Sequence, residues 1–294
     1  MTEDSNSETP PVTSDPPNDF RIEVDPGSVE SYEGKEIYTS VIGFMATVAI
    51  LPFEDTINSR LWEDRARPLL PRIYVSNKGN ARIKHSIWAF QQLLKQLGDI
   101  TYYPDLTMRV FVGTEQVLWC SIFRHATPPL EGEASDFAAP AVARRDPQAI
   151  EARERIRFQT EYSADAAKNA ANTMLTSISE AIVQLSPIDV IIEYVTAHSF
   201  DISLLVWSTH VVDVLDTEWV INGLLSAALY LYDHNSYRDC VTYMLKANEA
   251  HDIATISVWK GELPPLPPQI EALGAQTMPV PPGRMQNDEN LIVN

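Results

Sequence analysis

Four stretches of the chain carry apolar residues at the three- and four-residue spacing of an amphipathic helix. This spacing predicts helices over residues 35–51, 81–97, 169–185 and 217–232. Pro52, Gly98 and Pro187 follow the first three helices, and such residues commonly end a helix. Asp216 or Thr217 suits the N-terminal cap of the fourth helix.

Short apolar runs between and after these helices are typical of strands. We expect single strands and two hairpins over residues 72–75, 204–208, 106–112 with 117–123, and 240–247 with 253–259. Residues 190–195 also fit a strand, but the matching segment of the first half does not, so this stretch is ambiguous.

The same order of elements therefore occurs twice. A gapless alignment with a shift of 134 positions pairs, among others, Ile87 with Ile221, Tyr103 with Tyr237, and Asp105 with Asp239. Repeated units commonly bury a face against each other. The sequence predicts an α+β fold of two tandem α-β-α-β-β repeats with small, mostly antiparallel sheets, packed about a pseudo-twofold axis and flanked by disordered tails.

The strands of the first hairpin are apolar on both faces. Met108 and Val110 point to one side and Phe111 to the other, and Trp119 opposes Cys120 on the return strand. A sheet with helices on one side only should be polar on the other. We therefore expect a second cover, supplied by the sister repeat or by a partner protein.

Composition divides the chain into five parts. We expect a disordered acidic tail, the first repeat, a linker with a charged helix over residues 147–162, the second repeat and a disordered proline-rich tail, over residues 1–31, 32–125, 126–165, 166–261 and 262–294. The proline cluster after residue 263 is either a ligand for an aromatic groove or a spacer.

Charge is unevenly distributed along the chain, which has a net charge of −18. Most of the acidity lies in the tails and linker, whereas residues 37–125 carry ten bases and seven acids and residues 166–261 carry four bases and eleven acids. Opposite charges favour docking of one repeat on the other, or of repeats from two molecules. Chance variation among solvated faces is the alternative.

The charged residues, apolar runs and cysteines also indicate where the protein is located and which partners it does not bind. The basic residues at 60, 65, 67 and 72 are interleaved with acids, which argues against nucleic-acid binding. The longest apolar run, over residues 37–53, is too short for a membrane span, and the N-terminus does not have the pattern of a signal peptide. Two unmatched cysteines indicate a reducing compartment. We therefore expect a cytoplasmic protein that binds neither nucleic acid nor membrane.

The chain contains none of the common catalytic, nucleotide-binding or metal-binding motifs. Histidines and acids gather in the second repeat, and a metal or acid–base site is conceivable there; their spacing matches no ligand pattern, so we expect solvated turns instead. The residues concerned are His198, His210, His234, His251, Asp201, Asp213, Asp233 and Asp252. The sequence therefore predicts no catalytic, cofactor-binding or metal-binding residues.

Other reactive or aromatic residues have structural explanations. Cys240 lies beside Asp239, with His234 and His251 close in sequence, which is compatible with a nucleophile and its base. Cys240 takes the position of Leu106 in the first copy, however, and this fits a small buried residue better. Cys120 aligns with Ala254 and has the same interpretation. The six tryptophans fit packing better than a ligand groove. The matched acids Asp105 and Asp239 either hold turns or meet across the pseudo-twofold axis.

The functional hypothesis is a non-enzymatic intracellular platform for protein interaction or assembly, built on the duplicated core. An enzyme or small-ligand binder with a site between the repeats is the alternative, and convergence of His198, His210 and Asp213 in a pocket would favour it. A homo-oligomeric shell or filament is a third possibility, through contacts between oppositely charged repeats.

Overall fold

The computed structural model describes residues 15–27, 32–98, 102–124, 156–163, 168–188, 190–191, 194–199, 201–208, 215–246, 252–261 and 292–293. The first sheet has the strand order β1 (Phe20–Pro26), β6 (Leu106–Val112), β7 (Glu115–Phe123), β4 (Arg72–Asn77) and β3 (Arg60–Trp62). The second has the order β15 (Ile292–Val293), β10 (Tyr194–Ser199), β11 (Ile202–Ser208), β14 (Asp252–Lys260), β13 (Cys240–Lys246) and β8 (Ile156–Tyr162).

All strand pairings in the two sheets are antiparallel. Two further pairs of two-residue strands lie at helix ends: β2 (Tyr32–Glu33) with β5 (Tyr102–Tyr103), and β9 (Val190–Ile191) with β12 (Leu215–Asp216). The helices are α1 (Gly34–Ala49), α2 (Ile83–Leu97), α4 (Ala171–Leu185) and α5 (Thr217–Asp233). Gly98 ends α2 with a positive φ of 56°, and Asp216 caps α5 by accepting the Glu218 N–H.

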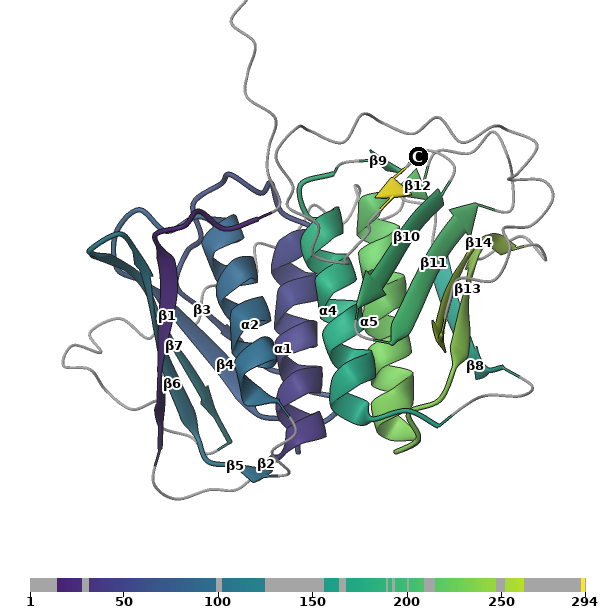
Figure 1. Ribbon diagram of the computed structural model, residues 1–294, viewed down its shortest axis with the longest axis horizontal. Coiled ribbons are helices and arrows are strands. Elements are labelled where there is room, and N and C mark those ends of the chain that lie inside the picture. The colour runs from purple at the N-terminus through teal and green to yellow at the C-terminus, as the bar shows by residue number, and fades with distance from the viewer. Residues whose placement is uncertain are drawn as a thin grey trace, which may run out of the picture.

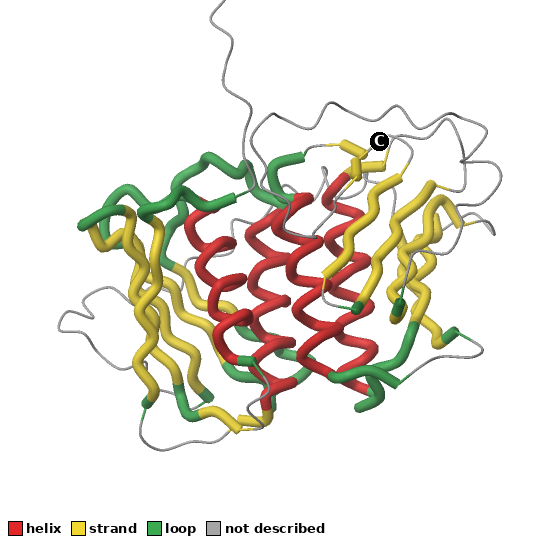
Figure 2. Tube along the Cα trace, in the orientation of Figure 1, coloured by secondary structure: helices red, strands yellow, loops and turns green. Residues whose placement is uncertain are grey.

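The helices lie between the two sheets, which form opposite ends of the molecule (Figure 1). α1 and α2 cover the first sheet and α4 and α5 cover the second, as the colouring by secondary structure also shows (Figure 2). α1 packs on α4 and α5, while α4 packs on α1 and α2. This reciprocal pattern is what a pseudo-twofold axis between the repeats produces, so the α+β fold of two tandem repeats is confirmed.

The two sheets share one topology. Reading each from its first strand, β1, β6, β7, β4 and β3 correspond to β8, β13, β14, β11 and β10. The bridge of Thr56 to Arg82 corresponds to that of Val190 to Asp216, at the expected shift of 134 positions. Each repeat therefore contains the predicted α-β-α-β-β order with two additional strands, one before the first helix and one after it.

The gapless alignment holds for β6 and β13 but fails in the next strand. Met108 pairs with Cys120, whereas its counterpart Thr242 pairs with Ile256. Cys120 therefore corresponds to Ile256 and not to Ala254, because Met108 and Cys120 are twelve positions apart while Thr242 and Ile256 are fourteen apart.

Strand β1 corrects the prediction that residues 1–31 are all disordered. Its sequence FRIEVDP alternates apolar and charged positions, and Phe20 packs against Trp88 of α2 with ring centroids 5.6 Å apart. Residues 1–14 and 28–31 of that tail lie outside the described residues, as do residues 262–291 and 294 of the proline-rich tail.

Strand β8 corrects the predicted charged helix over residues 147–162. Ile156, Phe158 and Tyr162 alternate with polar residues, and this period of two fits a half-buried strand. Pairing with β13 outweighs the helix propensity of the Glu- and Arg-rich segment, a tertiary effect that local propensity does not include. Residues 147–155 lie outside the described residues.

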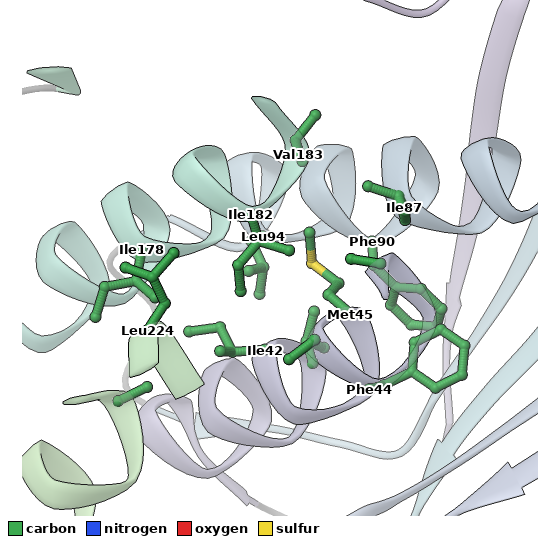
Figure 3. Close-up of a cluster of buried hydrophobic side chains, with 14 of the residues drawn as sticks. Ile42, Phe44, Met45, Ile87, Phe90, Leu94, Ile178, Ile182, Val183 and Leu224 are labelled. Atoms are coloured by element: carbon green, nitrogen blue, oxygen red, sulfur yellow. The ribbon is translucent and has the colours of Figure 1, made fainter. Parts of the chain in front are cut away.

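The expected cover of each sheet by the sister repeat is wrong, because the repeats meet through their helices. Ile42 and Met45 of α1 point toward Leu94 of α2 and Ile182 of α4, with Ile178 and Leu224 alongside (Figure 3). The outward face of the first sheet is nevertheless partly covered: Trp119, which faces away from the helices, is 6% exposed and its ring lies edge-on to that of Tyr74.

Candidate interaction surface

Contacts between the repeats follow the predicted difference in charge. Arg67 of the first repeat bonds the carboxylate of Asp233 at the end of α5, with Nη2 2.5 Å from Oδ2. Lys95 of α2 lies 2.8 Å from the buried carboxylate of Glu180 in α4. Lys35 donates to the Asn235 side chain at 2.8 Å. In each of these contacts the first repeat supplies the base.

The Arg67–Asp233 pair also affects protonation. The hydrogen bond from Arg67 lowers the pKa of Asp233, and the same bond raises the pKa of Arg67. Both groups therefore stay charged over the physiological range. Because the pair is partly exposed, it orients the repeats more than it stabilises them.

The matched acids Asp105 and Asp239 each form hydrogen bonds with distant segments of their own repeat. Asp105 accepts a hydrogen bond from the Tyr32 hydroxyl, and Tyr32 lies just before α1. Asp239 accepts the Asn169 side-chain N–H and the Lys260 backbone N–H, each at 2.9 Å. Asn169 lies just before α4, so both acids fasten the entry of the first helix of a repeat. These are long-range hydrogen bonds within one repeat, so a cap of a local turn by Asp105 or Asp239 stays a prediction.

Both cysteines are free, buried thiols. Burial raises the pKa of Cys240 to about 12, and burial also raises that of Cys120. A thiol with such a pKa is protonated at neutral pH and is a poor nucleophile. The expected role as small buried residues is confirmed for both.

The histidines of the second repeat divide between described and undescribed segments. His234 ends α5, and its ring lies against Tyr230 at 4.1 Å between centroids. His198 lies in β10, whereas His210, Asp213 and His251 fall outside the described residues. The convergence of His198, His210 and Asp213 therefore stays a prediction.

Two of the remaining acids occupy ordinary positions. Asp201 forms an ion pair with Lys260 at 3.2 Å, and Asp252 begins β14. In the part of the chain that the structure describes, no three His, Cys, Asp or Glu side chains form a group suited to a metal ion.

A ligand site between the repeats would have to lie among the helices, and the described side chains there are packed together. Ile42, Met45, Ile178, Ile182 and Leu224 are each fully buried and belong to a single apolar cluster that extends from one sheet to the other. This packing does not support the alternative hypothesis of a ligand site in the helix interface between the repeats.

The two sheets differ in the strands at their edges. In the first sheet, β3 is three residues long and β1 contains Pro26, which has no N–H to donate. In the second sheet, β8 has seven residues and β10 has six. Long edge strands present unpaired backbone groups to other chains. The second sheet is therefore the better candidate for binding an additional strand.

An additional strand, β15, already pairs with β10 within the chain. Ile292 and Val293 form β15, which pairs antiparallel with Thr196 and Val195, beside the C-terminal end of the chain (Figure 1). This edge was hard to predict, because residues 190–195 fitted a strand only ambiguously. The apolar LIV at the end of an acidic segment was the available signal.

Comparisons with known proteins identify no family. No protein-family model matches the chain, and no curated protein matches it. Among solved structures, the tandem DUF26 ectodomains of the Arabidopsis thaliana cysteine-rich receptor-like proteins PDLP8 and PDLP5 align at 11% and 12% identity, with TM-scores of 0.25 and 0.23. Each alignment covers 82% of this chain and 98% of the other.

A third solved structure, the β subunit of DNA polymerase III from Thermotoga maritima, aligns at 9% identity with a TM-score of 0.17, over 88% of this chain and 69% of the other. At these TM-scores the likenesses support no conclusion about fold or function. None of the helices in the described segments is long and apolar enough to cross a lipid bilayer.

Proposed function

We propose that this protein is a non-enzymatic intracellular interaction platform, and that the edge of β10 binds an extended apolar segment of a partner protein by strand addition. The observation that carries the proposal is the pairing of β15 with β10, in which Ile292 and Val293 occupy this edge. The buried free thiols support an intracellular location, because they form no disulfide.

Strand addition suits this edge on physical grounds. Backbone hydrogen bonds supply affinity, and side chains alternating along the added strand supply specificity. The next strand inward, β11, is rich in buried apolar residues, and its pairing with β10 extends over six positions. A regular ladder of this length holds β10 in an extended conformation, so a partner strand meets a preformed template.

The test uses a chain that ends at residue 290 and a labelled peptide of residues 288–294, whose sequence is DENLIVN. We expect the peptide to bind the shortened chain, and to bind the full-length chain at least tenfold more weakly, because the tethered segment competes at an effective concentration of roughly millimolar. Fluorescence anisotropy measures both affinities.

The matched control is the same peptide with Ile292→Pro and Val293→Pro, which cannot donate backbone hydrogen bonds at those positions. Hydrogen exchange gives a second measure, since residues 194–199 should lose protection on shortening and regain it with peptide. Equal binding of the two peptides, or unchanged protection, would contradict the proposal.

A further inference from the structure

The opposite edge of the second sheet, β8, has an unpaired backbone side among the described strands. The Ser163 N–H donates to the Asp239 carbonyl at 3.0 Å, which continues the register of β8 on β13. Hydrogen bonding alternates along an antiparallel pair, so Glu161 and Gln159 bond to β13. The N–H and C=O groups of Thr160 and Phe158 therefore point away from the sheet.

The side chains of β8 are arranged self-complementarily about Gln159. If the β8 strands of two copies paired about a twofold axis through this residue, Arg157 of each copy would lie opposite Glu161 of the other. The same axis places Phe158 opposite Thr160, so the outward-pointing backbone groups of the two strands face each other as hydrogen-bonded pairs. One register thus satisfies both the backbone and the charges.

Arg157 and Glu161 are available for such a contact. Both are exposed, and Arg157 forms no ion pair with any described residue. Glu161 accepts one hydrogen bond, from the Tyr243 hydroxyl at 3.0 Å, and a carboxylate can accept several. In the non-hydrogen-bonded positions that they would occupy, opposing side chains approach most closely.

The corresponding strand of the first repeat provides a comparison within the molecule. Arg21, Glu23 and Asp25 of β1 occupy the places of Arg157, Gln159 and Glu161. A twofold axis through Glu23 would oppose two carboxylates, and Pro26 removes an N–H. Arg21 is moreover paired with Glu23. The features that would allow self-pairing are thus specific to β8.

We propose that a second copy of this chain docks edge to edge on β8, so that the second sheet continues across a twofold axis into the sheet of the other copy. The half-buried Ile156 of one copy then faces Tyr162 of the other on the helix side of the joined sheet. This contact is distinct from the β10 edge, and it does not depend on the proposed function.

Sedimentation equilibrium of the full-length chain tests the proposal. We expect a monomer–dimer equilibrium that is weakened at least tenfold by Gln159→Glu, which copies the charge pattern of β1, and is abolished by Glu161→Arg, which opposes like charges. The double variant Arg157→Glu with Glu161→Arg should restore the dimer, because the opposed charges again have opposite sign.

The matched control is Arg21→Glu on β1, which should leave the dimer unchanged. Shortening the chain to residue 290 should also leave it unchanged, which separates this contact from the β10 edge. Circular dichroism confirms that each variant is folded. A wild-type monomer at high micromolar concentration, or a dimer indifferent to Gln159→Glu and Glu161→Arg, would overturn the proposal.

Discussion

At the scale of single residues, His85 shows how burial and neighbouring charge act together. Its ring lies near those of Trp88 and Phe20 at the start of α2, and Nδ1 accepts the Arg82 backbone N–H at 3.2 Å. Burial, with smaller contributions from the charges of Lys84 and Arg82, lowers the pKa of His85 to about 4. The imidazole therefore stays neutral in the folded protein at neutral and mildly acidic pH.

This pKa predicts a pH dependence of stability. In the unfolded chain His85 has an ordinary pKa near 6.5, so below that pH the unfolded state binds a proton that the folded state does not. The contribution to stability is complete above pH 6.5 and is lost as the pH falls toward 4. Because the ring is only partly buried, we expect a loss of about 1–2 kcal/mol.

Urea unfolding at neutral pH and at pH 5 measures this effect, with His85→Gln as the control. The variant removes the titrating group, so its free energy of unfolding should fall less than that of the wild type over the same interval. An identical pH dependence in the two proteins would show that His85 is not the responsible group.

At the scale of elements, close packing between helix and sheet relies on glycine. A Cβ at Gly43 of α1 would lie 2.3 Å from Cζ2 of Trp62 in β3, and a Cβ at Gly223 of α5 would lie 2.5 Å from Cδ1 of Ile256 in β14. At these distances any residue with a Cβ would clash with its neighbour unless the helix or the neighbouring side chain moved. The missing side chain lets a large sheet residue approach the helix axis in each repeat.

We therefore expect Gly43→Ala to destabilise the protein. Overpacking costs about 1–3 kcal/mol and the gain in helix propensity offsets up to about 1 kcal/mol, which leaves a net loss of about 1–2 kcal/mol in the free energy of unfolding. Gly79→Ala is the control, since its Cβ would meet only the end of the Glu115 side chain, at 3.1 Å. A stabilised Gly43→Ala variant, measured by chemical denaturation, would contradict this account.

Local periodicity was enough to predict the helices and the central strands, because their apolar faces are determined by sequence spacing. The edge strands were harder to predict from the sequence. β1 and β8 lie in segments with the composition of a tail and a linker, and only pairing with β6 and β13 makes them strands. In β8 the two-residue alternation of Ile156, Phe158 and Tyr162 was the available signal, and the charges around it obscured it.

At the scale of the whole molecule, the duplication could be predicted from sequence but the arrangement of layers could not. The apolar hairpin suggested that the sister repeat or a partner covers the outer face of the sheet, whereas the repeats meet through helices that lie between the sheets (Figure 1). A signal was present in α1, which has no charged residue after Glu36 and is buried on nearly every side. A helix that is apolar all round requires cover on both faces, and here the sheet supplies one and the sister helices the other.

The contacts between repeats then follow from charge and shape together. The apolar helix faces supply area, and Arg67 with Asp233 and Lys95 with Glu180 fix the orientation at the margins. Because the helices lie inside, the two sheets lie at opposite ends of the molecule. Their edge strands differ in length and in proline content between the repeats. The proposed roles of β8 and β10 both depend on this arrangement.

Nuclear Overhauser spectroscopy of the methyl-labelled full-length protein tests this arrangement directly. We expect cross-peaks between methyl groups of different repeats, from Ile42 and Met45 in α1 to Ile178 and Ile182 in α4 (Figure 3). Absence of these cross-peaks, together with contacts from the strands of one sheet to those of the other, would contradict it.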